Sequence, residues 1–137
     1  MYDSYNREIS YLRISVTDRC NLACSYCMPE QKAAVPRRDK LLSFDEITHI
    51  VHTLVPKGIS KIRLTGGEPL VRKNVDRLVE MISGIRGIRE VTMTTNGQLL
   101  AGRATRLAEA GLSRVNISLD TLNKERFRRI TRGGELR

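Results

Sequence analysis

Three cysteines lie within one short segment of the chain and nowhere else in it: Cys20, Cys24 and Cys27. Their C-x3-C-x2-C spacing lets a single loop surround an inorganic centre, and thiolates are the ligands of iron–sulfur clusters. An odd number of cysteines with no partner elsewhere argues against a disulfide framework. The pattern predicts a metal centre with three protein ligands and one metal position left open for another molecule.

Two alternatives to an iron–sulfur cluster follow from the same residues. A structural zinc site needs a fourth protein ligand, and the chain offers only His49 and His52. These lie three residues apart in a predicted helix, where a partly exposed helix position is the ordinary interpretation. The second alternative is three free cysteines that form a redox or incidental cluster.

The elements that must position this loop alternate between strand and helix. A capping box of Ser43 and Glu46 begins a helix that runs to about residue 56. From the second strand onward each strand–helix unit takes roughly 25 to 30 residues, the spacing of parallel strands joined by crossover helices. The strands are predicted at 11–17, 61–65, 90–95 and 114–120, and the further helices at 74–83, 99–110 and 123–131.

Each predicted strand has one apolar and one polar face. Ile62 and Leu64 alternate with Arg63, whereas strands covered on both faces read as unbroken apolar runs. We therefore expect an α/β fold: a partial parallel (β/α) barrel of about four βα units, with its helices outside and a polar concave face inside. The alternative is an open two-layer sheet whose polar face lies in bulk solvent.

The charge of the chain restricts its partners. Lys plus Arg number 24 against 15 Asp plus Glu, and this net charge of +9 favours an anionic partner such as a nucleic acid, a nucleotide, a phosphorylated metabolite or an acidic membrane. Four Tyr, two Phe and no Trp are few for a protein that stacks single-stranded bases. The N-terminal segment is polar, and no apolar run approaches the roughly 18 residues of a spanning helix. We therefore expect a cytoplasmic protein.

Several segments resemble the radical S-adenosylmethionine (SAM) enzymes, namely DRCNLACSYCMP at 18–29 and GGEPL at 66–70. Within that family the chain is similar to the GTP 3',8-cyclases of molybdenum cofactor biosynthesis, through LRISVTDRCN at 12–21, IRLTGGEPLVR at 62–72, TTNG at 94–97 and NISLDTL at 116–122. The resemblance implies a radical SAM lyase with a 4Fe–4S cluster and S-adenosyl-L-methionine as cofactors. It implies reductive cleavage of SAM to a 5'-deoxyadenosyl radical that is used to cyclise GTP.

The resemblance also implies roles for individual residues. It makes the three cysteines the cluster ligands, and it assigns SAM contacts to Tyr26, Gly67 and Ser118 and GTP contacts to Arg13, Arg63 and Thr94. Arginine suits a triphosphate because it forms charge-assisted, bidentate hydrogen bonds. The alternatives are a packing role for Tyr26, a plain turn at Gly66 and Gly67, a strand-end serine at Ser118 and solvated surface arginines.

Other basic residues are expected to contribute less. Lys61 is a weaker candidate for contact with the same anion. The remaining ones are expected to be mostly solvated surface: Arg72, Lys73, Arg126, Arg128, Arg129 and Arg132.

We expect residues 1–137 to form one radical SAM core domain, truncated before the family's last βα units and its C-terminal second-cluster region. The expected partners are GTP and an electron donor, without nucleic acid or membrane, and an oligomer is left open. The chain alone is expected to bind a cluster and SAM but not to cyclise GTP. The alternatives are a radical SAM enzyme acting on a peptide or another small molecule, and a zinc-stabilised basic module that binds nucleic acid.

Overall fold

A computed structural model describes residues 2–28 and 41–136 of the chain. None of the helices in these ranges is both long and apolar enough to cross a membrane. The elements follow in the order β1 (Tyr11–Ser15), α1 (Phe44–Leu54), η2 (Val55–Lys57), β2 (Lys61–Thr65), η3 (Pro69–Val71), α2 (Val75–Ser83), β3 (Glu90–Thr95), α3 (Ala104–Glu109), β4 (Arg114–Ile117) and α4 (Lys124–Thr131).

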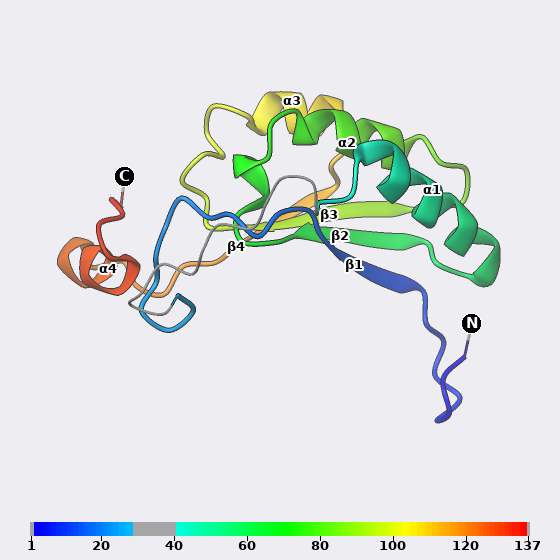
Figure 1. Ribbon diagram of the computed structural model, residues 1–137, viewed down its shortest axis with the longest axis horizontal. Helices are drawn as coiled ribbons and strands as arrows, with labels where there is room; N and C mark the ends of the chain where they lie inside the picture. Colours follow the sequence, from blue (N-terminus) through cyan, green and yellow to red (C-terminus); the bar gives the residue numbers. More distant parts are fainter. Residues whose placement is uncertain (1, 29–40, 137) are drawn as a thin grey trace.

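The four strands form one parallel sheet in the order β1-β2-β3-β4. Helices α1, α2 and α3 all cover the same face of this sheet, while α4 lies beyond the carboxyl ends of the strands (Figure 1). The predicted α/β fold with four parallel strands is confirmed, and the barrel is partial. No described helix covers the second face of the sheet (Figure 1).

Local sequence signals explain the ends of α1. The Ser43 hydroxyl accepts a hydrogen bond from the Glu46 amide at 3.1 Å, and the Glu46 carboxylate accepts one from the Ser43 amide at 2.6 Å. This is the predicted capping box. The helix passes into η2 and ends at Gly58, whose φ of 104° is a left-handed conformation that suits glycine.

Three predicted elements are clearly shorter in the structure, and the first is the strand predicted at 11–17, which ends at Ser15. The strand predicted at 114–120 ends at Ile117, because its partner β3 ends at Thr95 and the amide of Ser118 makes the last bond to the Thr95 carbonyl at 2.8 Å. The helix predicted at 99–110 begins only at Ala104. Successive turns precede it, and Gly102 in that stretch is a weak helix former.

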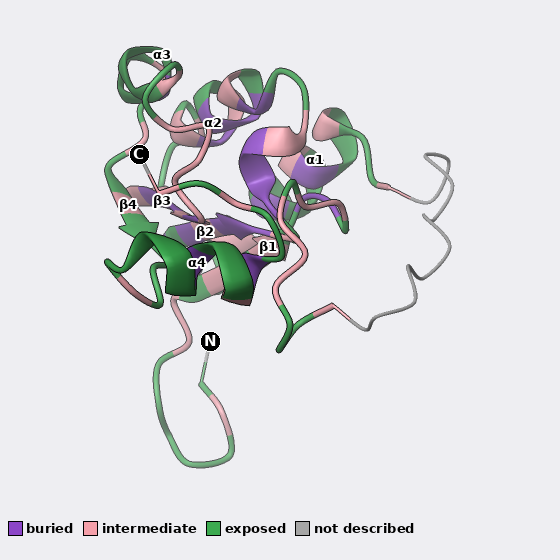
Figure 2. Ribbon diagram, turned by 90° about the vertical axis from the view of Figure 1, so that its left-hand side faces the viewer, coloured by how far each residue is buried: buried purple, intermediate pink, exposed green. Residues whose placement is uncertain are grey.

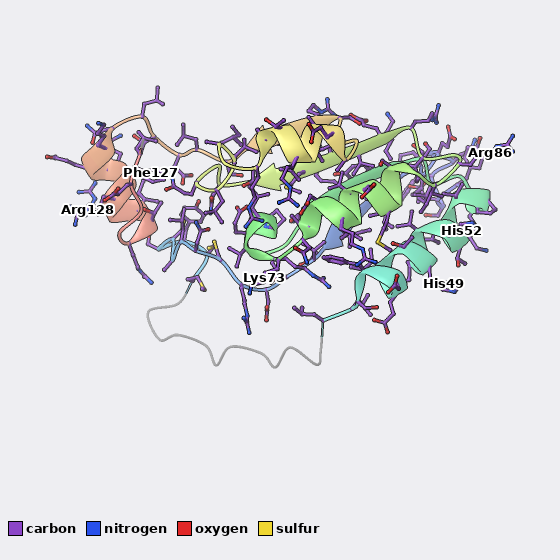
Figure 3. All side chains as sticks on the ribbon, turned by 90° about the horizontal axis from the view of Figure 1, so that it is seen from above. His49, His52, Lys73, Arg86, Phe127 and Arg128 are labelled. Atoms are coloured by element: carbon purple, nitrogen blue, oxygen red, sulfur yellow. The ribbon has the colours of Figure 1, made fainter. Side chains whose placement is uncertain are left out.

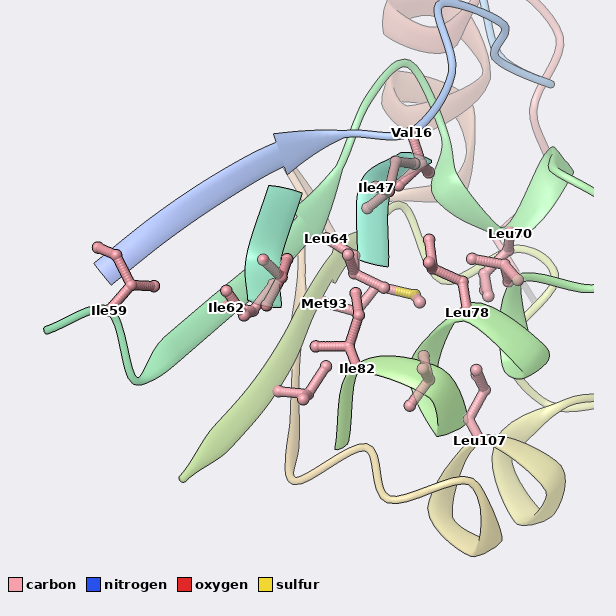
Figure 4. Close-up of a cluster of buried hydrophobic side chains, with 14 residues drawn as sticks. Val16, Ile47, Ile59, Ile62, Leu64, Leu70, Leu78, Ile82, Met93 and Leu107 are labelled. Atoms are coloured by element: carbon pink, nitrogen blue, oxygen red, sulfur yellow. The ribbon is translucent and has the colours of Figure 1, made fainter. Parts of the chain in front are cut away.

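The hydrophobic core lies between the sheet and helices α1 to α3 (Figures 2 and 4). Ile62, Leu64 and Met93 project into it from the strands and are fully buried, as are Leu78 and Ile82 of α2. Burial of such a side chain contributes about 1.5–3 kcal/mol. These strand residues are the apolar set of the predicted alternation, so the polar set occupies the face without helices.

Two leucine substitutions test the position of this core. Leu64 is fully buried, so Leu64→Ala should lower the free energy of unfolding by about 2–5 kcal/mol. Leu122→Ala is the matched control, because Leu122 is 80% exposed and its loss should change stability by no more than about 0.5 kcal/mol. Urea unfolding followed by circular dichroism measures both. Equal losses for the two variants would contradict the described core.

Candidate functional site

The sequence motifs meet at the carboxyl edge of the sheet, where active sites of parallel βα folds form. The cysteine loop, defined here as residues 16–28, follows β1, and the Gly-Gly loop, residues 66–68, follows β2. Asn96 and Gly97 follow β3, and Ser118 to Asp120 follow β4. Pro29, the last residue of the resembling cysteine segment, lies outside the described residues.

The backbone of the cysteine loop is held from two sides. The amides of Cys27 and Met28 both donate to the carbonyl of Cys24, at 3.0 and 2.9 Å, which forms a turn at these two cysteines. The amides of Ala23 and Ser25 donate to carbonyls at the end of α4, at 3.2 and 2.9 Å. Helix α4 therefore supports the loop that carries the thiols.

The Gly-Gly loop contacts the cysteine loop backbone to backbone. The Gly67 amide donates to the Thr17 carbonyl and the Glu68 amide to the Arg19 carbonyl, both at 2.7 Å. A Cβ atom on Gly67 would lie 2.3 Å from the Arg19 carbonyl oxygen, and one on Gly66 would lie 2.3 Å from that of Thr17. Glycine is therefore required here for packing within the chain. Contact of Gly67 with SAM stays a prediction.

Glu68 is a residue of the site's framework that the sequence analysis missed. Its side chain is only 1% exposed, and its Oε1 accepts hydrogen bonds from the Thr95 hydroxyl at 2.6 Å and the Leu70 amide at 3.0 Å. Its Oε2 accepts one from the Asn96 amide at 2.7 Å. The carboxylate thereby joins the ends of β2 and β3. The signal for this role in the sequence was an acidic residue directly before the apolar Pro69–Val71 segment.

Asn96 connects this junction to the cysteine loop. Its Nδ2 donates to Asn21 Oδ1 at 2.9 Å and lies 3.8 Å from Cys20 Sγ. The Leu22 amide also donates to Cys20 Sγ, at 3.4 Å. The Cys20 sulfur thus has two N–H donors within hydrogen-bond distance.

Tyr26 is 68% exposed and is not packed against the core. Its hydroxyl donates to Asp120 Oδ2 at 2.9 Å, and this hydrogen bond is the main cause that raises the pKa of Tyr26. Burial is the main cause that raises the pKa of Cys24, and the charge of Cys27 raises it further. The two thiols therefore lie close enough to interact. Asp120 was not expected as a partner of Tyr26.

The polar face of the sheet begins at the same edge. Arg13 of β1 lies opposite Arg63 of β2, which lies opposite Thr92 of β3. The Arg63 guanidinium donates to the Thr92 hydroxyl at 3.3 Å and lies 5.6 Å from the centroid of the Tyr11 ring. The ion pairs among residues 2–28 and 41–136 include neither Arg13 nor Arg63. Their charges are thus not neutralised by a described carboxylate.

The structure brings the predicted nucleotide residues to one face and the predicted SAM residues to one edge. Thr94 lies on the polar face, two residues along β3 from the partner of Arg63. Ser118 is exposed just beyond β4. Lys61 lies on this face as well, opposite Glu90.

The expectation of mostly solvated basic residues is wrong for Arg72, whereas Arg132 is exposed, as expected. The Arg72 guanidinium donates to the carbonyls of Val16 at 2.7 Å and Leu42 at 2.6 Å, and it lies 4.3 Å from the ring centroid of Phe44. Burial lowers its pKa. The Arg132 guanidinium donates to the Met28 carbonyl at 3.1 Å. The others are exposed, as expected: Lys73, Arg126, Arg128 and Arg129.

The donor set fits an iron–sulfur cluster better than a single metal ion. Within the described ranges, no three His, Cys, Asp or Glu side chains converge as ligands of one ion. A cluster does not need such convergence, because each thiolate binds a different iron. His49 and His52 are exposed on α1, at the far end of the molecule from α4 and the cysteine loop (Figure 3). A zinc site completed by these histidines is therefore not formed.

Comparison with known proteins agrees with this geometry. The sequence profile of the radical SAM superfamily matches residues 14–137, so the chain belongs to that superfamily. Membership implies a 4Fe–4S cluster and SAM as cofactors.

Individual relatives are similar over almost the whole chain. A GTP 3',8-cyclase of Pelotomaculum thermopropionicum is 56% identical over 136 residues, which are 99% of this chain and 42% of that protein. Molybdenum cofactor biosynthesis protein 1 of Dictyostelium discoideum is 51% identical over 130 residues, 95% of this chain and 21% of that protein. The chain thus spans less than half the length of these relatives.

A solved structure confirms the fold. SuiB of Streptococcus suis, bound to its precursor peptide SuiA, superposes with a TM-score of 0.68 at 21% identity, over 88% of this chain and 26% of that one. At this identity the likeness concerns the fold alone.

A glycine substitution tests the contact between the two loops. Gly67→Ala should lower the free energy of unfolding by about 1–3 kcal/mol, because its Cβ would overlap the Arg19 carbonyl. Gly102→Ala is the matched control, since nothing lies within 4 Å of the place that its methyl group would take. Hydrogen exchange of the Gly67 and Glu68 amides, read together with denaturant unfolding, should accelerate only in Gly67→Ala. Unchanged exchange there would refute the close contact.

Proposed function

We propose that this chain is the radical SAM core domain of a GTP 3',8-cyclase, a lyase of molybdenum cofactor biosynthesis. The observation that carries the proposal is the pair of arginines on the polar face of the sheet, Arg13 and Arg63, which form no ion pair with a carboxylate among residues 2–28 and 41–136. The similarity to GTP 3',8-cyclases over 99% of the chain supports the same substrate. We assign residues 1–137 to this core domain as a part of it, without the family's last βα units.

Cys20, Cys24 and Cys27 would hold the cluster, and an open iron would bind SAM. When bound, cluster and SAM supply a one-electron cleavage that yields a 5'-deoxyadenosyl radical. The protein holds the groups around the cluster and SAM in fixed positions. Backbone bonds from α4 fix the loop, and Asp120 fixes the hydroxyl of Tyr26.

Tyr26, Gly67 and Ser118 are the proposed SAM contacts. They come from three separate loops at one edge of the sheet. Tyr26 and Ser118 are exposed, so both are accessible to a ligand. Gly67 is packed against Arg19 where a side chain would be, and its other side is open to solvent.

Arg13, Arg63 and Thr94 are the proposed GTP contacts. Neighbouring strands lie about 4.8 Å apart, so guanidinium groups opposite each other in register can reach the same triphosphate. The hydrogen bond from the Arg63 guanidinium to the Thr92 hydroxyl holds this guanidinium in place before GTP binds. Preorganisation of this kind lowers the entropy lost on binding.

We further propose a cytoplasmic location, with GTP as a small-molecule substrate and a separate electron donor as partners, and without nucleic acid or membrane. The three cysteines are free thiols, which suits a reducing compartment.

Anaerobic reconstitution tests the cluster. The chain incubated with iron and sulfide should become brown, carry about four irons and bleach with dithionite. Cys24→Ala should lose most of this iron, while Ser25→Ala in the same loop should keep it. Iron and sulfide analysis with absorption spectra provide the measurement. A colourless protein that instead retains zinc would favour the nucleic-acid module.

Nucleotide titration tests the substrate. Arg13→Ala should weaken GTP binding at least tenfold with unchanged iron content, because a charge-assisted hydrogen bond contributes about 1.5–3 kcal/mol. The matched control is Arg86→Ala, since Arg86 is exposed at the far end of the molecule from α4 (Figure 3). Anaerobic calorimetry at constant ionic strength measures both affinities. Equal affinities would favour a radical SAM enzyme with another substrate.

A further inference from the structure

The side-chain amide of Asn96 stands between the end of β3 and the sulfur of Cys20. Its Nδ2 lies 3.8 Å from Cys20 Sγ, within the range of an N–H···S hydrogen bond, and donates to Asn21 Oδ1 at 2.9 Å. These two acceptors belong to the cysteine loop, and Asn96 lies on a different strand end. The contact thus spans 76 positions of sequence.

The direction of this amide is fixed by its neighbours. Asn96 Oδ1 accepts a hydrogen bond from the Gln98 amide at 3.0 Å, and Asn21 Oδ1 can only accept. A flipped amide would place two oxygens against each other and an N–H₂ group against an N–H donor. The orientation with Nδ2 toward Cys20 is therefore the one that satisfies all three neighbours.

The position of Asn96 is fixed as well. Its backbone amide donates to Glu68 Oε2 at 2.7 Å, and the other oxygen of this carboxylate accepts from Thr95 and Leu70. Glu68 is 1% exposed, so water does not compete for these bonds. The donor is thus held by a buried carboxylate before any ligand is present.

We propose that Asn96 is a positioning residue whose amide donates to the Cys20 thiolate and raises the reduction potential of the bound cluster. This rests on the proposed function, in which Cys20 is a cluster ligand. Reduction by one electron places additional negative charge on the cluster and its sulfurs, and an N–H donor stabilises the more negative state. Loss of the donor therefore makes the cluster harder to reduce.

The test measures the midpoint potential of the reconstituted full chain by redox titration followed with electron paramagnetic resonance. Asn96→Ala should decrease the equilibrium constant for cluster reduction about fivefold, which is about 40 mV more negative at 59 mV per tenfold for one electron. Asn96→Asp keeps the acceptor for the Gln98 amide and replaces the donor by a charge, so it should shift the potential further in the same direction. Asn96→Asp also provides the test if the Asn96→Ala variant does not fold.

Two control variants separate this role from a structural one. Asn21→Ala removes the other acceptor of the Asn96 amide but leaves its N–H donor beside the Cys20 sulfur. The equilibrium constant for cluster reduction should therefore change by no more than a factor of two. Asn74→Asp makes the same charge change at an exposed residue before α2 and should leave the potential unaltered. Thermal unfolding of each variant accompanies the titration.

The possible results are distinct. Asn96 variants that hold full iron at the wild-type potential would overturn the inference alone. A negative shift that occurs equally in Asn21→Ala would also overturn it, because loop distortion would then be the cause. A wild-type chain that takes up no iron would overturn the inference together with the proposed function.

Discussion

The site depends on a close approach between two loops that leave adjacent parallel strands. The backbone after β2 lies directly against the backbone after β1, with two amide–carbonyl bonds of 2.7 Å and no room for a side chain at Gly66 or Gly67. The next residue, Glu68, extends the contact to β3 through its buried carboxylate. One tripeptide thereby sets the relative positions of three strand ends, and the thiols, the proposed SAM contacts and the polar face follow from it.

Most of the fold could be predicted from the sequence because its signals are local. The capping box at Ser43, the glycine at the end of η2 and the alternation of β2 and β3 each act within a few residues, and each is confirmed. The ends of β1 and β4 were less predictable. A strand ends where its neighbour leaves the sheet, and for β4 that neighbour is separated from it by α3. The sequence pattern within β4 does not show where β3 leaves the sheet.

The site was predictable in its motifs but not in its supports. Cysteine spacing and the polar face point to a cluster and an anion, because thiolates and arginines have few other uses in that arrangement. The bonds from Asn96 to Cys20, from Tyr26 to Asp120 and from α4 to the loop join residues distant in sequence. Such pairs follow from the three-dimensional arrangement, and a single sequence does not reveal them.

Support of the cysteine loop by α4 imposes an order on how the protein matures. The loop is made before α4, yet its amides donate to carbonyls at the end of α4, and the Arg132 guanidinium donates to the Met28 carbonyl across 104 positions. Contacts of such high sequence separation form only after the intervening chain exists and has been brought together. The thiols therefore leave the ribosome long before the scaffold that arranges them is complete. Insertion of iron and sulfide into the fully supported loop therefore requires that α4 has already been made and has docked against the loop.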